Sequence, residues 1–186
     1  GFVDDVIMGE PGSSKIDISA LVIDLSEQLP DPQPIVRIWG NLIASRGNVS
    51  TVVGLAKSRK TFLTAAVAFF FADFLGFDTP ATGKVVYIDT EQARAHVHKV
   101  ARRILRSIGL PTDHNHDKLV VAALRELTPD QRREATGEIL RRYKPDLLIL
   151  DGVADLCNDP NDLHESEALT CELMRWSSEY DNHILC

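Results

Sequence analysis

The 186-residue sequence has few cysteines and no Cys-x-x-Cys pair. Its three cysteines (Cys157, Cys171 and Cys186) are too few and too unevenly spaced for a disulfide framework of the secreted type. We therefore predict reduced thiols in a cytoplasmic protein. Cys157 and His164 do not make a metal site by themselves, because such sites take three or four ligands, and we interpret them as a packing residue and a loop residue.

The sequence also has no long apolar run and no excess of basic residues. Its longest apolar stretch, residues 62–75, is interrupted by Thr64 and Asp73 and is shorter than the ~20 residues that span a bilayer. No basic-then-apolar start marks a secretory signal, so we predict no membrane partner. The net charge of −7 argues against a whole-surface grip on nucleic acid.

What is present is ordinary globular composition with an abrupt change of pattern near residue 35. Apolar residues make up 44% and charged residues 25%, which excludes a disordered chain, a coiled coil and a collagen-like polymer. Pro30, Pro32 and Pro34 separate an N-terminal extension, residues 1–34, from a core, residues 35–186. Apolar residues at 18, 21, 22, 25 and 29 predict a short amphipathic helix over 16–29, which the prolines end.

The core sequence alternates between strand and helix patterns. Two short apolar runs, 35–39 and 42–44, first predict a hairpin. Strands are then predicted over 51–53, 84–89, 119–123, 147–150 and 183–186, and helices over 60–75, 92–108, 128–143 and 165–180. Strands separated by helices predict an α/β fold with a mostly parallel sheet flanked by helices. Ligands bind such sheets beyond the carboxyl ends of the strands, so the chemistry is expected just after residues 53, 89 and 150.

A loop that resembles a phosphate-binding loop follows the first of these strands. It matches the pattern GxxxxGK[ST] except that Arg59 stands in place of the second glycine. Its backbone N–H groups and the following helix N-terminus are suited to cradle phosphates, with Lys60 reaching the β- and γ-phosphates and the Thr61 hydroxyl binding Mg²⁺. An ordinary basic helix start is the alternative. The candidate nucleotide-binding residues are Gly54, Leu55, Ala56, Lys57, Ser58, Arg59, Lys60 and Thr61.

Acidic residues follow two other predicted strands. Asp151 ends a run of four apolar residues, as a Walker B strand requires, and is predicted to hold the magnesium ion; a turn residue or helix cap is the alternative. Glu91, two residues beyond the strand at 84–89, is predicted to polarise the attacking water; a helix-start glutamate favoured by the dipole is its alternative. Because all three signals fall at carboxyl ends of strands, they predict a nucleoside-triphosphate site.

Together these segments resemble the RecA-like P-loop ATPases, and among them most the RepA-type ATPases of plasmids and mobile elements. The resemblance covers about residues 40–186 and is carried by RGN at 46–48, GLAKSRKT at 54–61, VVYIDTE at 85–91, LLILDG at 147–152, NDPNDLHE at 158–165 and NHILC at 182–186. It implies a RecA-like P-loop NTPase fold with a sheet order, by sequence, of 3-2-4-5-1. It also implies ATP and Mg²⁺ as ligands, with Lys60 and Glu91 catalytic, Thr61 and Asp151 on the metal, and His98, seven residues after Glu91, opposite the adenine.

The resemblance further implies a helicase-like ATPase, a ring or filament of identical subunits, and coupling to DNA replication, repair or mobilisation. In that family the γ-phosphate sensor, the DNA-facing loops and the finger residues come after the strand at 183–186. We therefore expect DNA contacts beyond Cys186, and little ATPase activity from residues 1–186 alone. Arg59 leaves a second hypothesis open: a nucleotide-binding regulatory or assembly module without efficient hydrolysis. The basic residues of 92–108 are interpreted as a solvated helix face, with a nucleic-acid or subunit contact as the alternative.

Overall fold

A computed structural model describes residues 21–38, 40–51, 77–78 and 83–186, and the chain divides into two units, Gly1–Asp31 and Pro32–Cys186. In the first unit, residues 21–29 form turns and bends, so the helix predicted over 16–29 is wrong for this stretch; residues 16–20 lie outside the described ranges. Asp24 Oδ1 accepts hydrogen bonds from the Ser26 backbone N–H at 2.8 Å and from the Ser26 hydroxyl at 2.6 Å. Such local bonds compete with helical ones, and a short isolated helix is only marginally stable in water.

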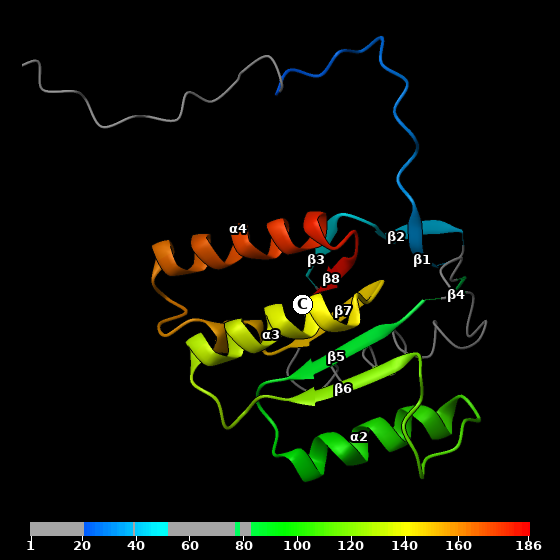
Figure 1. The fold of residues 1–186 in the computed structure, drawn as a ribbon, viewed down its shortest axis with the longest axis vertical. Coiled ribbons are helices and arrows are strands. Elements are labelled where there is room, and N and C mark those ends of the chain that lie inside the picture. Colours follow the sequence, from blue (N-terminus) through cyan, green and yellow to red (C-terminus); the bar gives the residue numbers. More distant parts are fainter. Residues whose placement is uncertain (1–20, 39, 52–76, 79–82) are drawn as a thin grey trace, which may run out of the picture. The chain divides into compact units, whose positions relative to one another are not determined.

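The second unit is built on a parallel five-stranded sheet (Figure 1). Its strands are β3 (Asn48–Ser50), β5 (Val85–Asp89), β6 (Leu119–Ala123), β7 (Leu147–Asp151) and β8 (His183–Leu185). Their spatial order is β3-β8-β7-β5-β6. This arrangement confirms the predicted α/β class. If the five parallel strands are numbered 1 to 5 along the chain, the order read from β6 is 3-2-4-5-1, as the resemblance implies. The strand β8 therefore lies between β3 and β7.

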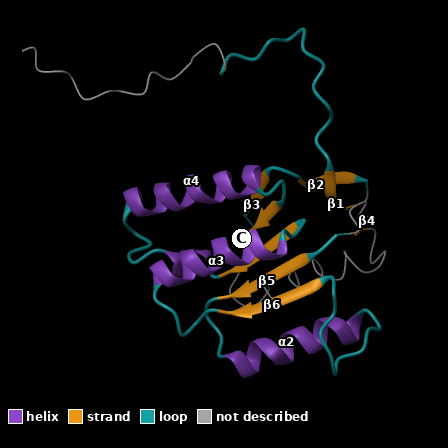
Figure 2. Ribbon diagram, in the orientation of Figure 1, coloured by secondary structure: helices purple, strands orange, loops and turns teal. Residues whose placement is uncertain are grey.

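Helices cover both faces of this sheet (Figure 2). One face packs against α2 (Arg94–Ser107), and the other against α3 (Pro129–Tyr143) and α4 (Leu163–Glu179). These helices confirm the predicted ones to within two residues at each end. The start of α3 is fixed by a capping box, in which Thr128 Oγ1 accepts a hydrogen bond from the Gln131 N–H and the Gln131 side chain accepts one from the Thr128 N–H.

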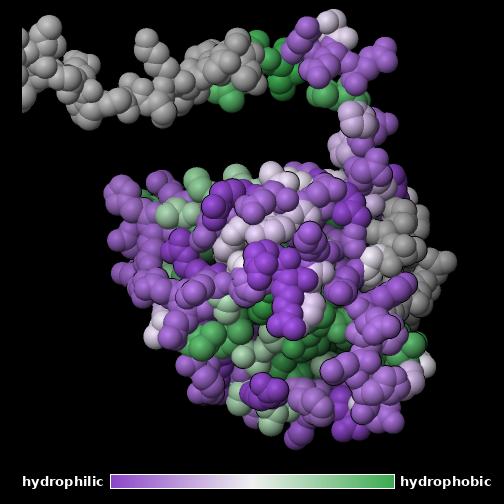
Figure 3. Space-filling view, viewed as in Figure 1, coloured by the Kyte–Doolittle hydropathy of each residue, from purple (hydrophilic) through white to green (hydrophobic). Residues whose placement is uncertain are grey.

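The core follows from the alternation of side chains along each strand. On β5, Val85 and Tyr87 pack in the cluster that contains the apolar residues of α2, while Val86 and Ile88 pack in the cluster that contains those of α3 and α4. Every residue of β5 is buried, as expected for a parallel strand covered on both faces. In the edge strand β6, only Leu119 is fully buried and the other four residues are half-buried. Hydrophobic surface is accordingly visible between α3 and α2 in Figure 3.

A second, antiparallel sheet with the order β2-β1-β4 contains β1 (Pro34–Ile38), β2 (Asn41–Ser45) and β4 (Phe77–Asp78). The pairing of β1 with β2 confirms the predicted hairpin. The parallel strand predicted at 51–53 is instead found at Asn48–Ser50; Thr51 is not part of it, and residues 52–53 and the helix predicted over 60–75 lie outside the described ranges. The position of β3 is set by pairing with β8, which the short polar sequence of β3 does not reveal. None of the helices that the structure describes is long and apolar enough to cross a membrane.

Polar contacts hold the edge of the sheet at which the parallel strands begin. Arg46, in the turn between β2 and β3, pairs with Asp146 and donates a hydrogen bond to the Asp181 carbonyl at 2.7 Å. Asp146 also accepts a hydrogen bond from the Lys84 backbone N–H at 2.8 Å. Because these residues precede β3, β5, β7 and β8, the contacts align the starts of four strands.

The buried His183 on β8 gives the stability of this domain a pH dependence. Its side chain is buried, its Nδ1 donates to the Ser45 carbonyl at 3.0 Å, and its Nε2 has no hydrogen-bond partner in the described part of the chain. Burial lowers the pKa of His183, and the Ser45 hydrogen bond only partly opposes this. Below the ordinary histidine pKa of about 6.5, the unfolded chain therefore binds a proton at His183 more readily than the folded chain does.

We accordingly expect the free energy of unfolding to fall as the pH decreases through the ordinary histidine pKa of about 6.5, with a slope of at most about 1.4 kcal/mol per pH unit from this one group. Urea unfolding at several pH values measures this slope. His183→Gln should flatten it, whereas the exposed His164, changed to Gln, should leave it unchanged. Identical slopes for wild type and His183→Gln would show that His183 does not titrate in this way.

Candidate active site

The carboxyl ends of the five parallel strands meet at one edge of the sheet, which we call the active edge. There β5 ends at Asp89 and β7 at Asp151, and these two residues are direct partners in the register of the two strands. The strand β3, which ends at Ser50, leads toward residues 54–61. These candidate phosphate-loop residues, including Lys60 and Thr61, lie outside the described ranges, so the observed geometry concerns Glu91, Asp151 and their neighbours.

Asp89 organises the turn that carries Glu91. This carboxylate is buried and accepts four hydrogen bonds: from the backbone N–H of Glu91 (2.9 Å), the backbone and side-chain N–H groups of Gln92 (2.7 and 2.8 Å), and the Tyr87 hydroxyl (2.9 Å). A buried carboxylate is costly unless it is hydrogen-bonded in this way. The role of Asp89 is therefore structural: it holds the backbone of the turn that contains Glu91.

The Tyr87 hydroxyl links the ends of β5 and β7. Besides its contact with Asp89, it lies 3.3 Å from Asp151 Oδ2, and the Tyr87 ring is buried. Burial raises the pKa of Tyr87, and the negative charges of Asp89 and Asp151 raise it further. The hydroxyl consequently stays protonated and serves as a donor between two carboxylates that would otherwise repel each other.

Thr90 and Gly152 bring the segments that follow β5 and β7 into contact. The buried Thr90 hydroxyl donates to Asp155 Oδ2 at 2.8 Å and lies 3.0 Å from the carbonyl oxygens of Asp151 and Gly152. Gly152 has φ +96°, and a Cβ there would lie 2.0 Å from Thr90 Oγ1 and 3.3 Å from Glu91 Cγ. The left-handed backbone and the absent side chain at Gly152 thus allow the two segments to approach closely.

The structure brings together two of the residues predicted to carry the chemistry. Asp151 is half-buried at the end of β7, and Glu91 is exposed immediately beside Gly152. An exposed carboxylate next to a half-buried one gives the active edge one group that can reach solvent or substrate and another held by the sheet. Carboxylate oxygens are the ligands that Mg²⁺ prefers, and Mg²⁺ commonly takes only one or two of them besides phosphates and waters. The absence of a cluster of three or more His, Cys, Asp or Glu within the described ranges is compatible with such a site.

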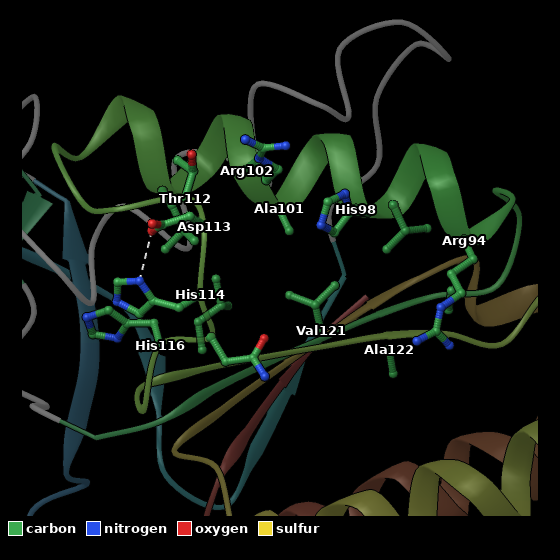
Figure 4. Close-up of a pocket in the computed structure, with 15 residues that line it drawn as sticks. Arg94, His98, Ala101, Arg102, Thr112, Asp113, His114, His116, Val121 and Ala122 are labelled. Atoms are coloured by element: carbon green, nitrogen blue, oxygen red, sulfur yellow. Dashed lines mark hydrogen bonds and ion pairs between the residues drawn. The ribbon is translucent and has the colours of Figure 1, made fainter.

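His98, the third predicted contact, is placed differently. It lies on α2 and lines a cavity between α2 and β6, on the same stretch of helix as Arg94 and Arg102 (Figure 4). Its side chain is exposed, and among the described residues it has no hydrogen-bond partner. The described part of the structure thus gathers Glu91 and Asp151 but does not gather His98 with them.

A comparison with known protein families identifies the family of this chain. The family model described as AAA domain matches residues 13–186, nearly the whole sequence. The chain belongs to the AAA domain family. These domains are P-loop ATPases, so this AAA domain is a nucleotide-binding ATPase domain of a family that generally binds ATP with Mg²⁺. No match is found among curated proteins.

Several residues that shape the active edge of this AAA domain were not singled out from the sequence as site residues. They are Tyr87, Asp89, Thr90, Gln92, Gly152 and Asp155. One signal was available for the first two, because residues two apart on a strand share a face. The contacts to Asp151 and Asp155 depend on the pairing of β5 with β7, which crosses about 60 residues of sequence and is not encoded in either segment alone.

Proposed function

We propose that this AAA domain binds Mg–ATP at the active edge and hydrolyses it, with Glu91 as the general base. The observation that carries the proposal is the position of Glu91 beside Gly152, at the edge where Asp151 ends β7 and where β3 leads toward residues 54–61. Phosphoryl transfer requires mainly positioning and charge stabilisation. A single edge that holds a carboxylate base and a metal-binding carboxylate supports this chemistry.

Each residue has a defined task in the proposed mechanism. Residues 54–61 cradle the phosphates through their backbone N–H groups, and Lys60 neutralises charge on the β- and γ-phosphates. Thr61 and Asp151 would hold the magnesium ion, which when bound offsets phosphate charge and orients the transferred group. Glu91 accepts the proton of the attacking water. Asp89 holds the Glu91 backbone in place, because its Oδ1 accepts a hydrogen bond from the Glu91 backbone N–H at 2.9 Å.

We also propose the more specific role that the resemblance implies. The domain would act as a RecA-like, RepA-type ATPase in a ring or filament of identical subunits and couple hydrolysis to DNA replication, repair or mobilisation. The strand order β3-β8-β7-β5-β6 supports the RecA-like part of this proposal. Subunit assembly is tested by sedimentation with and without Mg–ATP, and a chain that stays monomeric with bound nucleotide contradicts it.

The nucleotide assignment is tested by removing the Lys60 ammonium group. Lys60→Ala should weaken binding of a non-hydrolysable Mg–ATP analogue roughly 10- to 100-fold, since hydrogen bonds from charged groups contribute about 1.5–3 kcal/mol. Titration calorimetry measures the affinity, and the exposed Lys118, changed to Ala, is the matched control with the same loss of charge. Equal affinities for wild type and Lys60→Ala would overturn the assignment of residues 54–61 as the phosphate loop.

A regulatory or assembly module that binds nucleotide without efficient hydrolysis is the second candidate. It is favoured by one feature, Arg59, which stands where the phosphate loop normally has a glycine that permits close approach of the backbone to phosphate. Tight Mg–ATP binding with no phosphate release supports this candidate. Phosphate release that depends on Glu91 supports hydrolysis instead.

A further inference from the structure

The guanidinium group of Arg132 bridges two segments at the active edge. This half-buried side chain, near the start of α3, donates hydrogen bonds to three backbone carbonyl oxygens. Nε donates to Leu124 at 3.2 Å, Nη2 to Arg125 at 2.8 Å and Nη1 to Asp155 at 2.8 Å. Leu124 and Arg125 follow β6, whereas Asp155 belongs to η2 (Val153–Leu156), the short 3₁₀ helix after β7. Because β5 lies between β6 and β7 in the sheet, Arg132 connects the two neighbours of β5.

Asp155 continues this connection to the residue that precedes Glu91. Its Oδ2 accepts a hydrogen bond from the Thr90 hydroxyl at 2.8 Å. The Asp155 backbone is itself held, because its carbonyl accepts the Arg132 bond and its N–H donates to the Gly152 carbonyl at 2.9 Å. A threonine hydroxyl has one proton, and a carboxylate is a stronger acceptor than a carbonyl oxygen. The contact with Asp155 therefore sets the orientation of the Thr90 side chain.

The hydrogen bonds close a circuit around the carboxyl end of β5. On one side, the Asp89 carbonyl accepts a hydrogen bond from the Leu124 backbone N–H at 2.8 Å. On the other side, the Thr90 hydroxyl donates to Asp155. The circuit consists of Asp89, Leu124, Arg132, Asp155 and Thr90. Glu91 is the next residue along the chain, so its backbone leaves a segment that is held from both neighbouring strands.

We propose that Arg132 is a positioning residue for Glu91, and that it acts through Asp155 and Thr90. The inference rests on the proposed function, in which Glu91 accepts the proton of the attacking water. A general base must lie within hydrogen-bond reach of that water, and a displacement of about 1 Å can cost about 100-fold in rate. Because the Glu91 side chain is exposed, packing constrains it little, and the circuit supplies the required precision through the backbone.

The first experiment measures single-turnover phosphate release from Mg–ATP by variants of the full 186-residue chain. Arg132→Lys keeps the positive charge but replaces the planar fork by one ammonium nitrogen, which cannot serve all three carbonyl groups. Arg133→Lys is the matched control, since Arg133 is half-buried on the same helix and pairs with Glu172 of α4. Thr90→Val removes the hydroxyl at nearly constant size, and Thr90→Ser retains the hydroxyl.

We expect Arg132→Lys and Thr90→Val to lower the hydrolysis rate roughly 10- to 100-fold, while Arg133→Lys and Thr90→Ser stay within about threefold of wild type. The affinity for a non-hydrolysable Mg–ATP analogue should stay within about threefold in all four variants, because the circuit holds the base and not the phosphates. Adding Thr90→Val to Glu91→Gln should cause no further loss of rate, since the hydroxyl acts through the Glu91 carboxylate.

A second measurement needs no nucleotide. The backbone N–H groups of Glu91 and Gln92 both donate to Asp89 Oδ1, and their hydrogen exchange, resolved by NMR, reports how firmly the turn is held. Exchange at these two amides should be at least about tenfold faster in Arg132→Lys and Thr90→Val than in wild type, which corresponds to about 1.4 kcal/mol. Arg133→Lys should leave it unchanged. The two test variants break the circuit at different points, so each tests it without the other.

The positioning role is overturned by any of four results. Thr90→Val hydrolyses ATP at the wild-type rate although Glu91→Gln does not; Arg132→Lys and Arg133→Lys lose rate equally; Thr90→Val slows hydrolysis further in the Glu91→Gln protein; or hydrogen exchange at Glu91 and Gln92 is unchanged in both test variants. Failure of the proposed function gives a different result: Glu91→Gln hydrolyses ATP as wild type does, which removes Glu91 from the mechanism and this inference with it.

Discussion

Glu91→Gln should reduce the rate of ATP hydrolysis by roughly 10²- to 10⁴-fold, the usual contribution of a general base, while Mg–ATP still binds. The substitution keeps the size of the side chain and removes its ability to accept a proton from water. Because Glu91 is exposed and its backbone is held by Asp89, the change should not disturb the turn. Nucleotide affinity should stay within about threefold, since the residue acts on the attacking water and not on the bound phosphates.

The measurement is phosphate release with the protein in excess over ATP, because single-turnover conditions resolve slow rates. Glu126→Gln is the matched control, an exposed glutamate in the loop that follows β6, and it should hydrolyse ATP at the wild-type rate. A Glu91→Gln protein that retains more than about a third of the wild-type rate would remove Glu91 from the mechanism. An equal loss in the control would attribute the effect to charge alone.

Gly152→Ala should destabilise the domain by about 3 kcal/mol. The residue has φ +96°, which costs a residue with a Cβ about 1–2 kcal/mol, and the new methyl would lie 2.0 Å from Thr90 Oγ1. Thr90 has no room to yield because it is buried and bonded to Asp155, and overpacking of this kind adds typically 1–3 kcal/mol. Urea unfolding followed by circular dichroism measures the change.

The clash and the backbone strain can be separated with two further variants. Gly109 has φ +74°, and nothing lies within 4 Å of a Cβ added there. Gly109→Ala should therefore lower the free energy of unfolding only through backbone strain, by about 1 kcal/mol. Thr90→Ala combined with Gly152→Ala should be less destabilising than the sum of the single changes, since the oxygen that meets the new methyl is gone. Strict additivity, or equal losses at Gly152 and Gly109, would contradict close contact between the two segments.

Hydrophobic periodicity and capping signals predicted most of the fold. The strand at 119–123 and the helix that Thr128 caps were confirmed residue for residue, because a short apolar run and a Thr–Pro helix start are local properties of the chain. The helix expected over 16–29 was wrong for residues 21–29, where hydrogen bonds from Ser26 to Asp24 form a local turn. Hydrophobic periodicity does not reveal that such local side-chain hydrogen bonds compete with helix formation.

For the candidate site, the sequence by itself determined which residue types follow each strand: Glu91 after β5, Asp151 at the end of β7 and the loop at 54–61 after β3. Only the tertiary structure decided that the Tyr87 hydroxyl lies between Asp89 and Asp151 and that Thr90 closes against Gly152. It likewise placed His98 at a cavity between α2 and β6 and not with Glu91 and Asp151. The physical reason is that strand order and register are fixed by burial and backbone pairing between segments far apart in sequence, and no single segment contains that information.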